Sequence, residues 1–118
     1  MKYLCLIYDE EKKLGAMSKS ESDAFMGEYR AFTTSIRESG HYVAGEALKP
    51  VSTASTVRVR NGKASTTDGP FAETREQLGG FYMITARDLN EALQIAARIP
   101  SARIGSIEVR PIMDFSQS

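Results

Sequence analysis

The sequence is poor in the residues that build covalent or metal cross-links. It has one cysteine, Cys5, and one histidine, His41, in 118 residues. A single cysteine cannot form a disulfide within the chain, and the paired Cys/His spacing of a structural zinc site is missing. Because Cys5 lies in a short apolar run, we expect a buried and unreactive thiol. This cysteine usage is typical of the reducing cytoplasm, which is the compartment we expect.

An excess of charge of either sign is also missing. The 15 Lys and Arg residues balance the 15 Asp and Glu residues, so the formal net charge is +0. A neutral chain without a basic patch gains no bulk electrostatic attraction to nucleic acids or anionic membranes. We therefore expect neither nucleic acid nor membrane among its direct partners.

Long hydrophobic runs and the common cofactor motifs are absent too. The first apolar run, residues 3–8, is preceded only by Lys2 as a charge and leads directly into the charged residues 9–13. A membrane span needs about 20 apolar residues, and no signal peptide is expected from this pattern. The sequence lacks phosphate-loop, dinucleotide-fingerprint and nucleophile-elbow spacings, so we expect no cofactor and no metal.

What is present fits one globular domain spanning residues 1–118. Hydrophobic residues make up 42% of the chain and charged residues 25%. A chain of this length buries about two-thirds of the surface that it exposes when unfolded, which supports a core without cross-links.

The hydrophobic pattern predicts two helices. Ser18 with Glu21 and Ser20 with Asp23 both have the spacing of a capping box before a helix over residues 21–39, and Gly40 provides its end. Asp88 with Glu91 predicts the start of a second helix, which ends before residue 100.

The remaining segments predict strands. Residues 2–8 and 81–85 are apolar on both faces, whereas residues 41–48 and 106–110 are mixed. Residues 56–60 alternate strictly before Asn61-Gly62, a pair that favours a two-residue turn, so residues 63–67 should return antiparallel.

The resulting order, β-α-β-β-β-α-β, predicts an α+β fold. It corresponds to a ferredoxin-like split β-α-β arrangement with an inserted hairpin, an antiparallel sheet and two helices on one face. Two helices cover only one sheet face, although several strands are apolar on both. We therefore expect a homodimer, with a bound ligand or a partly polar monomer face as the alternatives.

The segment Asp68-Gly-Pro-Phe-Ala-Glu-Thr-Arg-Glu-Gln-Leu-Gly-Gly-Phe-Tyr82 resembles the signature of the DGPF proteins within the YCII-related family. Residues 1–8, 45–48 and 105–112 resemble the first, second and last strands of that family. The resemblance covers nearly the whole chain and implies a ferredoxin-like, dimeric α+β barrel.

The resemblance offers clues to function without naming a substrate. A related YCII branch includes a dehydrochlorinase that acts on a chlorinated hydroxyhydroquinone, with a histidine and aspartate pair associated with its first helix. Here Tyr29 falls where the histidine would be and Glu38 near the acidic position, so an acid/base site must be assembled differently. Genes for DGPF relatives are often associated with extracytoplasmic-function sigma factors, which makes such a factor a candidate partner.

Three residues are candidates for acid/base catalysis. Asp68 lies at a strand-to-loop transition beside Gly69 and Pro70, where it serves either as a base in a cleft or as a turn residue bonded to the backbone. His41 ordinarily titrates near neutrality, and its alternative is a surface cap of the preceding helix. Tyr29 is the third candidate, as a proton partner.

Three further residues are candidates for substrate binding. Arg58 and Arg110 would orient an anionic group, or they simply occupy solvated strand faces. Tyr82 offers a phenol at the end of an apolar surface, where ordinary core packing is the alternative.

Two functions follow from these observations. The first is a small-molecule binding protein or a cofactor-independent, lyase-like acid/base enzyme for a small substrate, with aromatic molecules among the candidates. The alternative is a non-enzymatic regulatory protein that interacts with a sigma factor.

Overall fold

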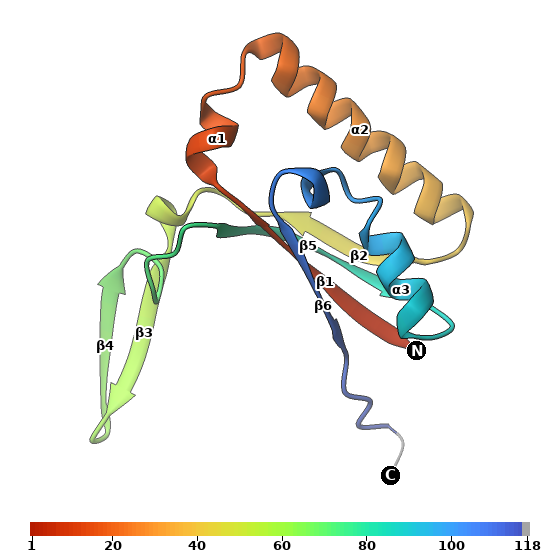
Figure 1. The fold of residues 1–118 in the computed structure, drawn as a ribbon. Helices are drawn as coiled ribbons and strands as arrows, with labels where there is room; N and C mark the ends of the chain where they lie inside the picture. Colours follow the sequence, from red (N-terminus) through yellow and green to blue (C-terminus); the bar gives the residue numbers. More distant parts are fainter. Residues whose placement is uncertain (117–118) are drawn as a thin grey trace.

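The computed structural model describes residues 1–116 as an α+β fold of two antiparallel sheets and three α-helices (Figure 1). The elements, in chain order, are β1 (Lys2–Asp9), α1 (Glu11–Gly15), α2 (Lys19–Glu38), β2 (Tyr42–Ala47), the 3₁₀ helix η1 (Val51–Thr53), β3 (Ser55–Arg60), β4 (Lys63–Asp68), β5 (Gln77–Thr85), α3 (Leu89–Ala96), the 3₁₀ helix η2 (Pro100–Arg103) and β6 (Ser106–Pro111).

The larger sheet has four strands in the order β2-β5-β1-β6, and all neighbouring strands are antiparallel. β1 and β2 thus run in the same direction with β5 between them, and α2 connects them. This is the split β-α-β unit of the ferredoxin-like fold. The prediction of an antiparallel α+β fold is confirmed.

The ends of α2 follow from local side-chain chemistry. Ser18 accepts a hydrogen bond from the backbone N–H of Glu21, and the Glu21 side chain accepts one from the backbone N–H of Ser18. At the other end Gly40 has a positive φ of 81°, and the backbone N–H of His41 bonds to the carbonyl of Ile36. These are a capping box and a Schellman-type end. The structure selects the first of the two predicted boxes and confirms the end at Gly40, and the helix begins at Lys19 instead of residue 21.

Two features differ from the sequence prediction. α1 was not expected, because its five residues carry too few apolar positions to show a helical period. β5 begins at Gln77 and not at residue 81. A register shift opposite Ile7 and Tyr8 leaves Gly79 as the extra residue of a bulge.

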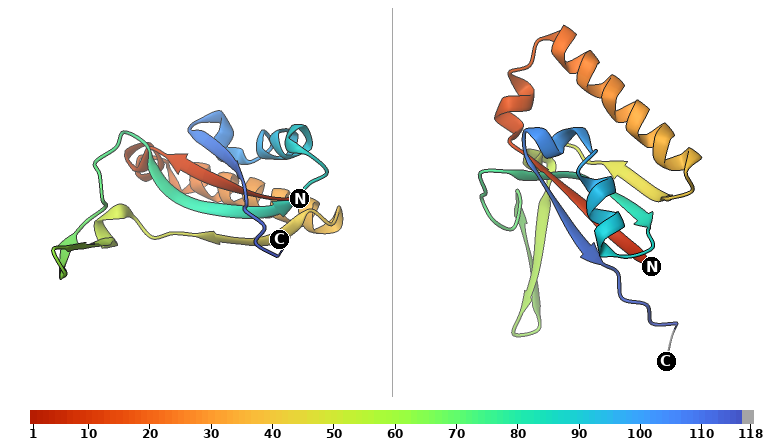
Figure 2. Two further views of the ribbon diagram at one scale, coloured as in Figure 1. Left: turned by 90° about the horizontal axis from the view of Figure 1, so that it is seen from below. Right: turned by 45° about the vertical axis from the view of Figure 1, so that its right-hand side comes forward.

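The hairpin β3–β4 forms a separate two-stranded sheet, which projects from the larger sheet as an arm (Figures 1 and 2). Asn61 and Gly62 both adopt positive φ angles, 53° and 76°, and so form the expected tight turn. Val57 and Val59 on the arm are 62% and 58% exposed. The arm therefore has little hydrophobic burial of its own in one copy of the chain.

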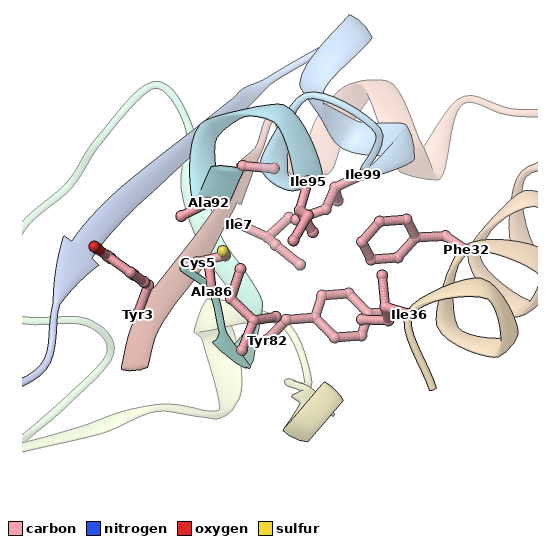
Figure 3. Packing of buried hydrophobic residues seen from close by; sticks show 12 residues of the cluster. Tyr3, Cys5, Ile7, Phe32, Ile36, Tyr82, Ala86, Ala92, Ile95 and Ile99 are labelled. Carbon is pink, nitrogen blue, oxygen red and sulfur yellow. The ribbon is translucent and has the colours of Figure 1, made fainter. Parts of the chain in front are cut away.

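The hydrophobic core lies between the larger sheet and the helices. In Figure 3, Phe32 and Ile36 of α2 face Tyr82 of β5 and Ile99, which follows α3. The rings of Phe32 and Tyr82 meet edge to face with centroids 5.1 Å apart. Cys5 is fully buried in this core, and burial raises the pKa of its thiol to about 11, as expected for an unreactive cysteine.

The sheet face turned away from the helices, here called the open face, is apolar at its centre. Its cross-strand pairs are Leu4 with Met83 and Leu6 with Phe81, and all four side chains are half-buried. The molecule measures 50 × 48 × 18 Å, so it is thin across the sheet.

Within residues 1–116, the helices are too short or too polar to cross a membrane.

Candidate functional site

Two pockets flank the larger sheet. One of about 1080 Å³ lies between the arm, the start of β5 and the end of β1. The other, here called the helix-side pocket, has about 780 Å³ and lies between α1 and α2 on one side and β1, β2 and β5 on the other. The helix-side pocket contains a buried carboxylate, so the candidate site is built there.

Asp9 supplies that carboxylate. It is the last residue of β1 and continues the alternation that points Cys5 and Ile7 toward the helices, and its side chain is only 6% exposed. Its Oδ1 atom is buried and has no hydrogen-bond partner within residues 1–116. A buried carboxylate with an unpaired oxygen is costly for folding, which is typical of a functional site.

Ser101 links Asp9 to Tyr29, and both of these residues line the helix-side pocket. This fully buried residue of η2 donates a hydrogen bond from its Oγ to Asp9 Oδ2 at 2.9 Å. The Tyr29 hydroxyl lies 2.5 Å from the same Ser101 Oγ. Because Ser101 gives its only hydrogen to Asp9, Tyr29 donates to Ser101. Tyr29, Ser101 and Asp9 thus form a hydrogen-bonded chain, here called the relay, with the phenol at the pocket surface.

Aromatic side chains form the walls around the relay. Phe25 meets Tyr29 edge to face with ring centroids 5.4 Å apart. Tyr82 is 8% exposed, and its hydroxyl lies 2.6 Å from Thr33 Oγ1. Tyr42 meets Tyr82 with ring centroids 6.4 Å apart. These rings and the polar relay give the pocket the composition of a small-molecule site, mostly apolar with a few fixed polar groups.

The surroundings shift the protonation of the relay. Burial raises the pKa of the Asp9 carboxyl above its ordinary value, the hydrogen bond from Ser101 partly offsets this, and the negative charge of Glu76 adds to it. Burial likewise raises the pKa of Tyr29 to about 12. At neutral pH the phenol is therefore a proton donor, and the carboxylate is a stronger base than an exposed aspartate.

Two arginines of α2, Arg30 and Arg37, also line the helix-side pocket. The Arg37 guanidinium lies over the Tyr42 ring, 4.3 Å from its centroid. Within residues 1–116, three or more His, Cys, Asp or Glu side chains do not gather anywhere into a metal-binding group.

The structure brings together two of the six residues that the sequence predicted for a site. Tyr29 and Tyr82 both line the helix-side pocket. Asp68 lies at the end of β4, exposed on the arm and paired with Ser55. His41 follows α2, with Nε2 3.3 Å from Glu91 Oε1, and it lines neither pocket.

The predicted binding arginines also lie elsewhere. Arg58 is on the exposed arm, where its guanidinium donates to the carbonyl of Phe71 at 3.4 Å. Arg110 is on the open face in β6, 3.5 Å from the Glu108 carboxylate. Neither of them lines the pocket that holds Tyr29 and Tyr82.

Sequence reasoning missed Asp9 and Ser101. Asp9 could have been found from the sequence. In the strand predicted over residues 2–8, alternate side chains face the core, and Asp9 is an acidic residue at the next core-facing position. The sequence gives no indication of Ser101, because the burial of this residue depends on how η2 packs against α2 and β1. The acidic group linked to Tyr29 thus comes from the first strand, and not from the end of the helix near Glu38.

The fold and pocket define a ferredoxin-like α+β protein with a buried acid beside an aromatic pocket. The chain matches the YCII-related domain family over residues 1–116. An uncharacterized protein of Rhizobium meliloti (strain 1021) is 40% identical over 114 residues, which are 95% of this chain and 92% of that protein. The chain therefore belongs to the YCII-related family, as the resemblance of residues 68–82 predicted.

Proposed function

We propose that the protein binds a small aromatic molecule in the helix-side pocket and transfers a proton through the relay. The observation that carries this proposal is the chain of hydrogen bonds from the Tyr29 hydroxyl through Ser101 to the buried Asp9 carboxylate. The pocket beside this hydrogen-bonded chain has walls of aromatic rings, which suit a flat, largely apolar ligand.

The relay fits a lyase-like elimination. A substrate C–H proton passes to the Tyr29 oxygen as Tyr29 gives its own proton to Ser101, and Ser101 gives its proton to Asp9. The electrons of the C–H bond form a new π bond, and the leaving group departs with the electrons of its bond to the substrate. Proton transfer of this kind contributes about 10²- to 10⁴-fold to a rate.

A generic elimination probe tests the proposal. Loss of one C–H proton from 5-nitrobenzisoxazole breaks its N–O bond and gives a coloured cyanonitrophenolate. We expect turnover by the protein above the buffer rate, and a fall of about 10²-fold in Asp9→Asn. Asp23→Asn, which changes an exposed aspartate near the start of α2, is the matched control. Equal rates for the protein and Asp9→Asn would refute the proton-transfer role.

Binding is tested separately with the neutral fluorophore N-phenyl-1-naphthylamine, whose emission rises in apolar surroundings. We expect saturable binding that Gly45→Leu abolishes, because a Cβ at Gly45 would already lie 2.8 Å from the Tyr82 ring beside the pocket. Gly15→Leu is the control, since a Cβ at Gly15 meets nothing within 4 Å. If the fluorophore does not bind, or binds Gly45→Leu equally well, the pocket is not the binding site.

We also propose that two copies pair through the open face and complete a dimeric α+β barrel. Its half-buried apolar pairs, Leu4 with Met83 and Leu6 with Phe81, support this pairing. The radius of gyration is 16.4 Å, against about 13.5 Å for a compact domain of this length. A thin chain with an extended arm gains burial when a second copy covers the sheet.

A further inference from the structure

Arg30 and Arg37 form a basic stripe along the rim of the helix-side pocket. The two residues are separated by about two helical turns, so both side chains emerge from nearly the same side of α2. Both line the pocket, together with Met26 and Thr33 of the same helix. The axial separation of about 10.5 Å lets two extended arginine side chains approach one group between them.

Neither guanidinium forms an ion pair within residues 1–116. Among residues 1–116, the carboxylates within 4.0 Å of a basic group pair with other residues, such as Glu28 with Arg103 and Glu10 with Arg75. Arg37 instead stacks on the Tyr42 ring at 4.3 Å, which fixes the guanidinium plane and leaves its N–H edge available. Burial raises the pKa of Tyr82, the hydrogen bond with Thr33 lowers it, and the charge of Arg37 adds a smaller lowering effect.

Within residues 1–116, neither acidic residue of the pocket lining forms an ion pair with Arg30 or Arg37. Asp9 is bound by Ser101 on the inner wall. Glu46 lies in β2, where it is the cross-strand partner of Phe81. The pocket therefore combines an aromatic interior with two arginines at one edge, whose charges are available to a ligand.

We infer that the ligand of the helix-side pocket carries an anionic group of the carboxylate or sulfonate type, which Arg30 and Arg37 bind while its aromatic body lies against Tyr29 and Tyr82. This inference rests on the proposed function, because it names the chemical class of the molecule bound there. Arginine donors suit such a group, since the guanidinium presents two parallel N–H bonds to a pair of oxygens.

Two fluorophores of matched shape test the inference. 1-Anilinonaphthalene-8-sulfonate is N-phenyl-1-naphthylamine with one added sulfonate. We expect the sulfonate to bind about tenfold more tightly than the neutral compound at low salt, and the two to compete for one site. Rising salt should remove much of this preference, because both arginines are exposed at the rim.

Arginine variants test whether Arg30 and Arg37 cause the preference for the sulfonate. Arg30→Gln and Arg37→Gln should each weaken sulfonate binding by about three- to tenfold and leave the affinity for the neutral fluorophore within about twofold. Arg60→Gln on the arm is the control, since its guanidinium bonds only to its own neighbour, the carbonyl of Val59, among residues 1–116. If Arg60→Gln weakened sulfonate binding equally, the sulfonate would be attracted by the positive charges of the surface in general, and the inference would be overturned.

The remaining outcomes separate this inference from the proposed function. Equal affinity for both fluorophores, unchanged in the α2 variants, overturns the anionic ligand but keeps the aromatic pocket. Failure of both fluorophores to bind overturns the pocket itself and the inference with it.

Discussion

Ser101 donates a 2.9 Å hydrogen bond to Asp9 although 92 residues separate the two in the chain. The bond joins the last residue of β1 to a 3₁₀ helix that follows α3, and both side chains are buried. With the Tyr29 hydroxyl on the other side of Ser101, it links Asp9 and Tyr29, two residues that line the helix-side pocket.

Removal of the Ser101 hydroxyl should break the relay. In Ser101→Ala the Asp9 carboxylate loses its only hydrogen bond within residues 1–116, so we expect a loss of about 1 to 3 kcal/mol of unfolding free energy. Elimination of 5-nitrobenzisoxazole should fall by about tenfold or more, as in Tyr29→Phe. The control Ser106→Ala removes an exposed hydroxyl bound to Glu76 at 2.8 Å, and it should change both quantities little. A Ser101→Ala protein with full activity would show that no proton passes through Ser101.

The raised pKa of Asp9 predicts an unusual pH dependence of stability. When the pH rises through the ordinary pKa of an aspartate, Asp9 loses its proton in the unfolded chain but keeps it in the folded protein. The unfolded state is therefore favoured progressively more, until the pH passes the raised pKa that Asp9 has in the folded protein. The unfolding free energy of the protein relative to Asp9→Asn should therefore fall as pH rises above the ordinary aspartate pKa of about 4, by about 1.4 kcal/mol per unit of pKa difference. Denaturant unfolding across this range measures it. A relative stability that instead increases with pH would show that Asp9 is stabilised in its charged form.

Gly105 allows the chain to pass close to Asp9. A Cβ at this position would lie 2.1 Å from the carbonyl oxygen of Tyr8 and 2.9 Å from Asp9 Oδ1. We expect Gly105→Ala to lose about 1 to 3 kcal/mol of unfolding free energy, or more, because backbone atoms must shift. Gly15→Ala, with open space around it, should be neutral or slightly stabilising. Equal thermal stability of the two variants would contradict the close packing around Asp9.

A charge on the open face should prevent the proposed pairing of two copies. Leu6→Glu places a carboxylate opposite Phe81 at the centre of that face, and we expect a monomer in light scattering coupled to size exclusion. Leu93→Glu on α3, at a residue 48% exposed, is the control and should remain dimeric. A monomeric parent protein, or a dimeric Leu6→Glu, would refute pairing through this face.

The sequence was sufficient for elements whose formation depends on near neighbours. The capping box of Ser18 and Glu21, the Asn61-Gly62 turn and the Asp88 cap of α3 are each determined within a few residues, and all three were predicted. α1 was missed because a five-residue helix shows too little periodicity, and the start of β5 was missed because Gly79 and Gly80 interrupt the strand pattern with a bulge.

The site was less accessible to sequence reasoning because it is made by tertiary contacts. Tyr29 and Tyr82 were predicted and line one pocket, whereas Asp9 and Ser101 meet only when η2 packs beside β1. The roles predicted for Asp68, His41, Arg58 and Arg110 stay predictions, as does a sigma factor as partner. All four residues lie outside the helix-side pocket.

The pH profile of 5-nitrobenzisoxazole elimination, measured for the protein, Asp9→Asn and Asp68→Asn, tests the central claim most directly. We predict a rate that rises with pH through an apparent pKa above the ordinary aspartate value, because the base must be deprotonated and burial raises the pKa of Asp9. This rise should persist in Asp68→Asn and disappear in Asp9→Asn. A profile that Asp9→Asn leaves unchanged and Asp68→Asn abolishes would place the base on the arm and contradict the proposed site.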